Sequence, residues 1–388
     1  MRIGIVGARL AGSYAALLLT RQGHEVLLID DSTHKEKPCG GGVTAKALSS
    51  MTWFHENSLP HTEIETLRMT TPDGQSSDIP LRHPIRIYSR FTLDSALRDT
   101  AIRTGTRLVP ERALYLQPSR NGWVIGTRKN ELEVNFLVGA DGATSSVRGA
   151  VTSKFSATDL SLAVGFYLPG LHHPNTILTA FQESSFLGYL WSFPRVDHAS
   201  IGILHWLPQA NAADMRRRVL GFISKQYPHA GPEKRLYAAR IPCLSRRTLV
   251  QQRVCGGNWA LLGDAAGFAD AITAEGIYFA LRSAELFAES LQRSDPLLYE
   301  SAWRRDFGIH LHKAAAWRDR FYGGTFLLQA FTRRALQALR HSATVRSLAD
   351  DLVSGFRSYE EMRRQLILRC PRILLEAFRH KIAANVTK

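Results

Sequence analysis

The chain begins with a short apolar run that leads into a glycine-containing turn, and this start constrains the fold more than any other feature. Arg2–Val6 is typical of a β-strand, residues 13–22 of a helix that ends before Gly23, and Glu25–Ile29 of a second strand. A strand, a helix and a second strand in this order form a βαβ unit, which opens doubly wound α/β sheets. We therefore expect a Rossmann-like domain at the N-terminus.

Two glycines of the turn occupy positions of the G-x-G-x-x-G nucleotide-binding fingerprint. Gly7 and Gly12 are its first and third glycines, whereas Arg9 replaces the middle one and must point away from the phosphates or reach over them. The turn, with Ala11, is expected to bring the N–H groups of the following helix to a pyrophosphate. Asp30, at the end of the second strand, is placed to bind a ribose hydroxyl. The pattern predicts a dinucleotide site without identifying the dinucleotide.

Two later segments each place a Gly-Asp pair directly after an apolar strand. A strand expected at 133–138 leads into the sequence GADGA, which contains Asp141. A second, at 259–262, leads into GDAAGF, which begins with Gly263 and Asp264. Such turns face the ligand crevice of a doubly wound sheet. Taken singly, each is explained equally well as a turn whose aspartate caps a helix.

Together, in this order and spacing, the three segments resemble the FAD-binding family that includes aromatic hydroxylases, flavin halogenases and geranylgeranyl reductases. The resemblance covers nearly all of residues 1–290 and implies FAD as the cofactor. It implies that Asp141 supports the FAD and the domain core, and that Asp264 faces the ribityl and pyrophosphate part. Arg90 begins an R-x-x-x-D-x-x-L sequence that starts a helix in this family, and it would approach the FAD. Because a second G-x-G-x-x-G is absent from the sequence, we expect transient NAD(P)H or another carrier as reductant.

One segment is similar to the geranylgeranyl reductase branch of this family. The sequence KPCGGGV at 37–43 resembles that branch's P-C-G-G-G segment, which lies beside the isoalloxazine. The resemblance implies that Gly40, Gly41 and Gly42 let the backbone approach the flavin ring, with Cys39 as a contact or weak acid. Composition alone also fits a flexible loop with an inert cysteine.

A second segment, YLWSFP at 189–194, resembles the Y-x-W-x-F-P motif of the same reductases. The two-residue period of a strand puts Tyr189, Trp191 and Phe193 on one face, and the resemblance makes them the lining of the substrate cavity. An aromatic stripe on a strand is otherwise core packing. Halogenation is not expected, because the halogenases' W-x-W-x-I-P segment is absent and residues 155–224 contain no lysine.

The residues after GDAAGF continue the resemblance. The family commonly has D-P-x-T-G-E-G-I here, and this chain has DAITAEGI at 270–277. Glu275, Gly276 and Ile277 are retained, whereas Ala274 stands in place of a glycine. The retained residues enter a helix whose N-terminal N–H groups are expected to face the flavin pyrimidine ring.

The resemblance implies an FAD-dependent reductase that adds a hydride from reduced flavin and a proton to a carbon–carbon double bond of an isoprenoid chain. Cys39 and Tyr189 are the candidate proton donors by residue type. The alternative is an FAD-dependent monooxygenase of an apolar or aromatic metabolite, since such enzymes share every FAD motif. A third hypothesis is a flavin-containing binding or redox-sensing protein without turnover. The four cysteines form no C-x-x-C pair, so no metal is expected.

These segments predict an α/β fold with three parts. The FAD-binding domain is expected to comprise residues 1–155 and 256–295. An antiparallel substrate-binding sheet is expected from 60–90 and 156–255, where aromatic residues and few lysines suit one wall of an apolar pocket. Residues 296–388 are expected to form a basic, helical C-terminal region.

Much of the positive charge is concentrated at the C-terminus. The chain has 49 Lys+Arg and 34 Asp+Glu, a net charge of +15, and residues 331–388 contribute 12 basic against 5 acidic residues. Residues 363–375 mix arginines with aliphatic side chains, as in a helix at a lipid interface, although a solvated charged face fits equally well. No nucleic-acid-binding motif accompanies the charge, so nucleic acid is not an expected partner.

The sequence also predicts a location. It has no signal-peptide pattern and no apolar stretch of about 20 residues that would span a bilayer. Scattered cysteines without a disulfide framework suit a reducing compartment. We therefore expect a cytoplasmic protein that lies peripherally on the anionic inner face of a membrane and acts on an apolar small molecule or prenyl lipid.

Overall fold

The computed structural model describes residues 1–32, 34–171, 175–183, 186–326 and 329–386. The chain forms two compact units, each built from three separate segments. Unit 1 consists of Met1–Lys37, Ser89–Ser161 and Arg240–Ala315, and unit 2 of Pro38–Tyr88, Leu162–Ala239 and Ala316–Lys388. The three-part division expected from the sequence stays a prediction.

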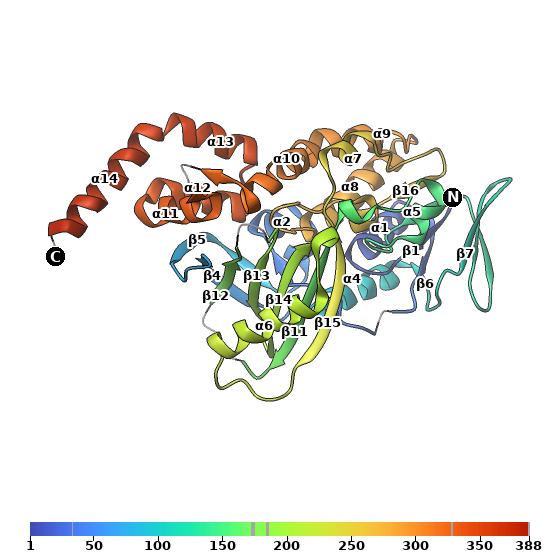
Figure 1. The fold of residues 1–388 in the computed structure, drawn as a ribbon. Coiled ribbons are helices and arrows are strands. Elements are labelled where there is room, and N and C mark those ends of the chain that lie inside the picture. The colour runs from blue at the N-terminus through green and yellow to red at the C-terminus, as the bar shows by residue number, and fades with distance from the viewer. Residues whose placement is uncertain (33, 172–174, 184–185, 327–328, 387–388) are drawn as a thin grey trace. The chain divides into compact units, whose positions relative to one another are not determined.

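A five-stranded parallel sheet organises unit 1 (Figure 1). In spatial order its strands are β16 (Trp259–Leu261), β10 (Phe136–Gly139), β1 (Arg2–Val6), β2 (Glu25–Ile29) and β6 (Arg107–Val109). Each neighbouring pair is parallel. Nearly every residue of β1, β2 and β10 is buried, which explains why these strands are continuously apolar in sequence instead of alternating.

Helices α1 (Leu10–Arg21), α4 (Arg90–Thr104) and α8 (Ile277–Gln292) pack together in unit 1. A three-stranded antiparallel sheet of β7 (Tyr115–Ser119), β8 (Gly122–Gly126) and β9 (Glu131–Val134) contacts β1 and β10. The remaining helices of unit 1 are short: α5 (Ser146–Val151), η1 (Ala157–Asp159), α7 (Arg246–Gln251), η3 (Gly263–Ala266), α9 (Leu298–Trp303) and η4 (Arg304–Gly308).

The prediction of one strand over 133–138 is wrong, because the chain leaves one sheet and enters another at Asn135. The backbone N–H of Asn135 donates to the Arg2 carbonyl, and the Arg2 N–H donates to Asn135 Oδ1, both at 2.8 Å. These bonds lie where β9 ends and β10 begins, and they depend on Arg2, which is far from Asn135 in the sequence.

Unit 2 is built on an eight-stranded sheet. Its order is β15 (Arg235–Pro242), β11 (Leu160–Pro169), β14 (His198–Trp206), β13 (Tyr189–Pro194), β12 (Thr176–Phe181), β4 (Thr62–Thr70), β5 (Ser76–Ile87) and β3 (Gly42–Val43). The sheet differs from the antiparallel one expected in a single described pairing, because β4 and β12 are parallel. These two strands come from distant chain segments, so no hairpin fixes their relative direction.

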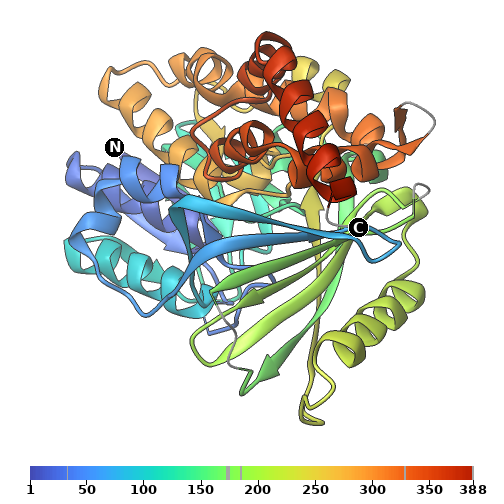
Figure 2. The same ribbon diagram turned by 90° about the vertical axis from the view of Figure 1, so that its left-hand side faces the viewer.

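Helix α6 (Ala212–Gln226) lies along one face of this sheet, as Figure 2 shows. Its buried side chains Met215, Val219 and Ile223 recur every four residues and form one apolar stripe. The stripe packs on Ile201 and Ile203 of β14. Alternate side chains of β14 and every fourth side chain of α6 thus form one hydrophobic core.

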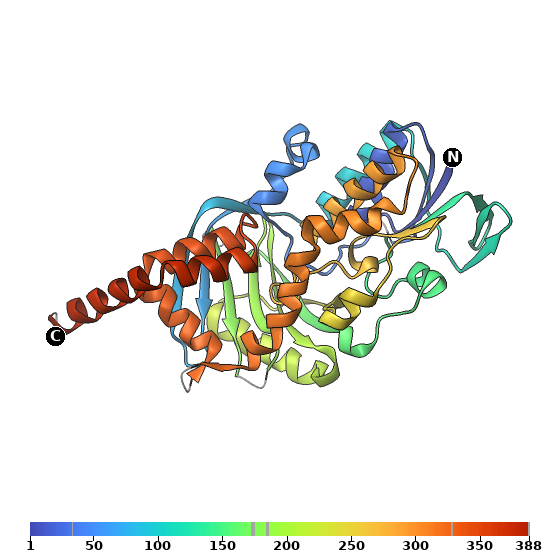
Figure 3. The same cartoon turned by 90° about the horizontal axis from the view of Figure 1, so that it is seen from above.

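The C-terminal part of unit 2 is helical (Figure 3). Its elements are α10 (Ile309–Gly323, which begins in unit 1), β17 (Thr325–Phe326), β18 (Gln329–Ala330), α11 (Phe331–His341), α12 (Ala343–Val353), α13 (Tyr359–Leu368) and α14 (Cys370–Val386). Shorter helices elsewhere in the unit are α2 (Ala45–Ser50), α3 (Thr52–Glu56) and η2 (Leu207–Gln209). Within the described residues, no helix is long and apolar enough to cross a membrane.

Candidate active site

The turn between β1 and α1 is narrow enough for close approach of a phosphate group. Gly7 has a φ of +104°, and a Cβ atom there would lie 2.4 Å from the Ala140 carbonyl oxygen. A Cβ atom on Gly12 would lie 1.8 Å from the Gly7 carbonyl oxygen. Neither position accommodates a larger residue. The first N–H groups of α1, around Ala11, have no intrahelical partners, so this turn fits the pyrophosphate of FAD.

Asp30 follows β2 and is already partly engaged. Its Oδ2 accepts a hydrogen bond from the Ala8 N–H, and its Oδ1 accepts from the N–H and the Oγ of Ser32, all at 2.7 Å. A carboxylate offers about four acceptor sites, so capacity for one further donor remains. A ribose hydroxyl fits that capacity, and the contact stays a prediction.

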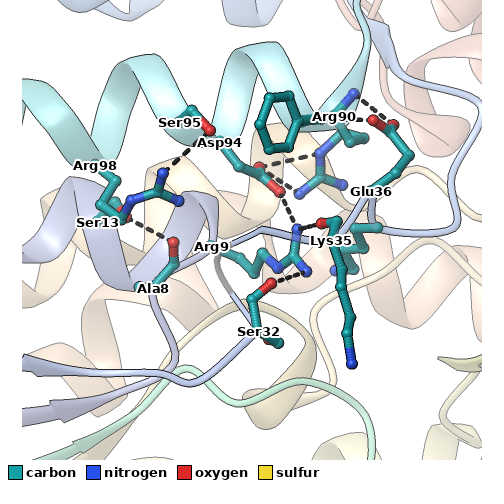
Figure 4. Close-up of polar contacts among 12 residues, drawn as sticks. Ala8, Arg9, Ser13, Ser32, Lys35, Glu36, Arg90, Asp94, Ser95 and Arg98 are labelled. Carbon is teal, nitrogen blue, oxygen red and sulfur yellow. Dashed lines mark hydrogen bonds and ion pairs between the residues drawn. The ribbon is translucent and has the colours of Figure 1, made fainter. Parts of the chain in front are cut away.

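Arg9 joins three parts of unit 1, a role that the fingerprint does not reveal (Figure 4). Its guanidinium donates to Asp94 Oδ2 at 3.1 Å and to the carbonyl oxygens of Lys35 and Ser32 at 2.7 and 3.0 Å. Its φ of −91° is ordinary extended backbone, so glycine is not required there. Arg9 therefore ties the loop after β2, which carries Asp30, to helix α4.

Arg90 begins α4 within the same network (Figure 4). Its guanidinium pairs with Asp94 at 2.8 Å, and the two side chains are 3% and 2% exposed. Glu36 accepts hydrogen bonds from the N–H groups of Arg90 and Phe91 and from Ser89 Oγ, so this residue of the loop after β2 caps helix α4. Glu36 was not anticipated from the sequence. The approach of Arg90 to FAD stays a prediction.

Asp141 organises the turn that follows β10. Its Oδ2 accepts from the N–H and Oγ of Ser146 at 2.6 and 2.8 Å, and its Oδ1 accepts from Ser145 Oγ. It thereby fixes the start of α5, as expected of a capping aspartate. That Asp141 also supports FAD stays a prediction.

The turn after β16 lies against the turn after β1. A Cβ atom on Gly263 would be 3.2 Å from that of Ala11. Asp264 pairs with Lys37 at 3.0 Å, and their side chains are 19% and 32% exposed. Lys37 thus places a positive charge at the aspartate that is expected to face the pyrophosphate. Lys37 directly precedes the PCGGG sequence, but its pairing with Asp264 could not be predicted from the sequence.

The loop between η3 and α8 is held by a buried carboxylate. Asp270 Oδ1 accepts from the N–H groups of Ile272 and Thr273 at 2.7 and 2.8 Å, and its Oδ2 lies 2.8 Å from His310 Nε2. His310 was missed because it lies in the region expected to be only a basic tail. Ala274, which replaces the family's glycine, adopts a φ of +58°.

Glu275 caps α8 by accepting the Tyr278 N–H at 2.8 Å. Burial and, to a smaller extent, the nearby Asp270 carboxylate raise the pKa of its carboxyl to about 7, although the capping bond and the Arg90 charge lower it. Gly276 follows, and a Cβ atom there would be 3.4 Å from Asp264 Oδ1. Ile277 is buried at the start of α8. The structure therefore brings Asp264 and the Glu275–Ile277 segment together in unit 1.

In unit 2, the loop that carries Cys39 is fixed to the large sheet. The Cys39 carbonyl accepts hydrogen bonds from Arg195 Nη2 at 2.7 Å and from Ser200 Oγ at 3.0 Å. Its Sγ accepts the Gly41 N–H at 3.3 Å. Gly41 has a φ of +88°, and a Cβ atom there would lie 2.1 Å from the Tyr88 carbonyl oxygen. A loop held this way has one defined conformation, and Arg195 and Ser200 were not anticipated.

The aromatic side chains of β13 lie beside this loop. A Cβ atom on Gly40 would be 3.0 Å from the Phe193 ring, and one on Gly42 would be 3.5 Å from it. The rings of Tyr189 and Trp191 are 5.9 Å apart, as expected for neighbours on one face of a strand. Trp191 is buried, whereas Tyr189 and Phe193 are partly exposed. Contact of these three side chains with substrate stays a prediction.

Tyr189 has a further aromatic neighbour from the C-terminal part of unit 2. Its ring is stacked on that of Tyr322 of α10, with centroids 6.5 Å apart and an interplanar angle of 8°. Across the described residues, no group of three or more His, Cys, Asp and Glu side chains is arranged to hold a metal ion.

Comparison with known proteins gives one family match and several relatives. The FAD binding domain family matches residues 1–169. The chain is 27% identical to geranylgeranyl diphosphate reductase of Synechocystis sp. over 366 residues, which cover 86% of this chain and 84% of that protein. It is 28% identical to menaquinone reductase of Mycobacterium tuberculosis over 340 residues, 79% of this chain and 81% of that one.

Among solved structures, the fold is similar to that of a geranylgeranyl bacteriochlorophyll reductase-like protein from Thermoplasma acidophilum. The TM-score is 0.75 with 18% sequence identity, and the match covers 94% of this chain and 98% of that one. At this identity the likeness concerns the fold. It agrees with the Rossmann-like sheet and the second, mixed sheet described above.

Proposed function

Because the chain is an FAD-dependent oxidoreductase of the geranylgeranyl reductase family, we propose that it reduces carbon–carbon double bonds of an isoprenoid chain. The observation that carries the proposal is the Cys39 loop, fixed by Arg195 and Ser200 beside Phe193 of the aromatic strand. The relatives support it, since two are named for reduction of geranylgeranyl diphosphate and of menaquinone, compounds that carry isoprenoid chains.

The residues of unit 1 that would hold FAD are the Gly7–Gly12 turn, Asp30 and the Lys37–Asp264 pair. When bound and reduced, FAD supplies a hydride for one carbon of the alkene. The other carbon takes a proton, so a side chain of this protein or a water that it orients has to deliver one. NAD(P)H, or another two-electron carrier, is the proposed source of the electrons.

Cys39 and Tyr189 are the proposed proton donors. The Cys39 thiol is half-buried, and the Gly41 N–H that it accepts fixes its orientation. We expect Cys39→Ala and Cys39→Ser to lower alkene turnover while FAD stays bound, since the loop is held through the Cys39 carbonyl and not through its sulfur. Turnover equal to wild type in both variants would remove Cys39 from the mechanism.

Oxygen consumption distinguishes the proposed reductase from the alternative monooxygenase. A reductase oxidises NAD(P)H in proportion to alkene reduced, with oxygen use only as a side reaction. A monooxygenase consumes one oxygen molecule for each NAD(P)H and each substrate. Measuring NAD(P)H and dissolved oxygen together, with a prenyl substrate present, therefore tests the proposal. Strict one-to-one consumption of oxygen coupled to product would overturn it.

We also propose that the protein works in the cytoplasm, at the inner face of the membrane. A prenyl chain leaves water for lipid because burial of its apolar surface is favourable. A net charge of +15 favours residence beside anionic headgroups, where such a substrate is found.

A further inference from the structure

Helices α13 and α14 of unit 2 carry large apolar side chains that are exposed among the described residues. Five of them are at least 48% exposed: Ile367 63%, Leu368 62%, Leu374 65%, Leu375 48% and Phe378 63%. Within α14, the last three lie on one face because residues three and four apart are neighbours on a helix. Ile367 and Leu368 end α13 just before α14 begins. We refer to these five residues as the α13–α14 apolar surface.

The opposite side of α14 is attached to the protein. Glu376 accepts hydrogen bonds from Ser342 Oγ at 2.5 Å and from the N–H and Oγ of Thr344 at 3.1 and 2.8 Å, at the start of α12. Burial alone would raise the pKa of Glu376, but these bonds outweigh it and hold the pKa at about 2. Since Glu376 is two residues from both Leu374 and Phe378, its attachment turns those side chains outward.

The apolar surface is accompanied by exposed positive charges. Among the side chains described from 359 to 379, five arginines are exposed: Arg363, Arg364, Arg369, Arg372 and Arg379. The acidic residues of the same stretch are fewer, and two of them are engaged locally. Glu361 closes a capping box with Ser358, and Glu376 is bound to α12. Arg372 pairs with Glu376 at 3.1 Å, so it lies toward the attached side of α14. The two helices therefore present exposed apolar and cationic side chains along the same stretch of the chain.

An anionic bilayer matches both properties at once. Apolar side chains of an interfacial helix enter the acyl boundary, while arginines keep their guanidinium groups at the level of the phosphates. A second copy of this chain matches only one of them, because its arginines would face those of the first copy and repel them.

We propose that the α13–α14 apolar surface docks on an anionic lipid bilayer, with Leu374, Leu375 and Phe378 inserted at the interface and the neighbouring arginines bound to lipid phosphates. This deepens the proposed location of the enzyme by naming the residues that make the contact. It rests on the location proposed above and not on the redox reaction.

Co-sedimentation of the FAD-loaded full chain with vesicles tests the docking. We expect wild type to sediment with vesicles of phosphatidylcholine and phosphatidylglycerol, less with phosphatidylcholine alone, and less as salt is added. Leu374→Asp with Phe378→Asp should reduce partitioning by at least about tenfold, because two apolar side chains no longer insert. The matched control is Val250→Asp, an equally exposed apolar residue of α7 (57%), which should bind like wild type.

The exposed Cys370 supplies a second readout that needs no separation of bound protein. A polarity-sensitive fluorophore attached there should shift to shorter wavelength with anionic vesicles in wild type and not in the double variant. A Cys370→Ser sample gives the background from other thiols.

Three results would overturn the proposal. They are no binding of wild type to anionic vesicles at low salt, equal binding by the double variant, and a wild-type dimer that forms without lipid and is absent in the double variant. The vesicles contain no prenyl substrate, so docking can fail while reductase activity persists. Turnover of a short, water-soluble prenyl diphosphate, expected to be unchanged in the double variant, reports on the reaction alone.

Discussion

At the scale of single residues, the site depends on charged groups that replace or support the glycine motifs. Arg9 stands where the fingerprint has glycine, yet its side chain forms three hydrogen bonds that tie the loop of Asp30 to α4. Arg195 has a comparable role in unit 2, where it donates to the Cys39 carbonyl. Glycines let the backbone come close to a ligand, and Arg9 and Arg195 hold the loops that carry those glycines and Asp30 in position.

Replacement of Arg9 should weaken both the fold of unit 1 and its hold on FAD. Arg9→Ala removes the bonds to Asp94, Lys35 and Ser32, so we expect a loss of about 1–3 kcal/mol in the free energy of unfolding and weaker FAD binding. Thermal denaturation and flavin fluorescence titration measure the two effects. Arg21→Ala, an exposed arginine at the end of α1, should change stability by less than about 0.5 kcal/mol. FAD affinity equal to wild type in Arg9→Ala would contradict this role.

Arg195 should act as a positioning residue for the Cys39 loop. In Arg195→Met the Cys39 carbonyl loses a charged donor, so we expect the loop to open more readily, by about 1–3 kcal/mol. Faster amide exchange in residues 39–42 and faster reaction of Cys39 with a thiol reagent, both in a Cys370→Ser background, are the measurements. Arg235→Met is the matched control, because Arg195 and Arg235 lie 5.2 and 5.3 Å from the same Tyr167 ring. Equal rates in the two variants would show that Arg195 does not hold the loop.

At the scale of elements, the sequence predicted those parts of the fold whose pattern is local. The βαβ start and the helix after GDAAGF form as expected, although α1 begins at Leu10, three residues before its predicted start. The break at Asn135 and the parallel pairing of β4 with β12 were not predictable, because each depends on a partner far along the chain. The same holds for the site: glycines and aspartates are visible as motifs, whereas Lys37, His310 and Arg195 act through contacts that only the folded chain makes.

Ala274 carries backbone strain that glycine should relieve. Its φ of +58° costs an alanine about 1–2 kcal/mol. Glycine removes this strain, but its greater freedom in the unfolded chain offsets part of the gain in folding stability. We expect Ala274→Gly to raise the free energy of unfolding by about 0.5–1 kcal/mol. Ser294→Gly, at the other described non-glycine position with positive φ (59°), should give a similar gain. Urea unfolding of the holoprotein measures both, and a destabilised Ala274→Gly variant would contradict the strain.

Glu275 should make stability depend on pH. Its pKa of about 7 lies above the ordinary 4.5, so the folded protein binds this proton more tightly than the unfolded chain does. The stability that the proton contributes is present below about pH 4.5 and is lost as the pH rises to about 7. Relative to Glu275→Gln, wild type should lose about 1–2 kcal/mol across this window, a value reduced for partial exposure.

Unfolding of wild type and Glu275→Gln at about pH 5 and about pH 8 isolates the Glu275 contribution, since all other groups titrate alike in both. Glu233→Gln, at an exposed loop position, should follow wild type at both pH values. A difference between wild type and Glu275→Gln that is the same at both pH values would show that Glu275 titrates normally.

At the scale of the whole molecule, exposed apolar side chains and exposed positive charges occur together in the C-terminal helices. The large apolar cores lie within the two sheets, whereas the C-terminal helices combine exposed arginines with exposed aliphatic side chains. Residues 359–386, which contain α13 and α14, carry six Lys+Arg and three Asp+Glu and so contribute +3 of the net charge of +15. These exposed side chains are the basis of the proposed docking on an anionic bilayer.

The central claim is that reduced enzyme transfers hydrogen to a prenyl double bond. The most direct measurement is mass spectrometry of a prenyl lipid incubated anaerobically with the purified, chemically reduced holoprotein. We predict a mass gain of two hydrogen atoms for each double bond reduced, with reoxidation of the flavin in the absence of oxygen. An unchanged prenyl mass, together with flavin that reoxidises only when oxygen is admitted, would contradict the account.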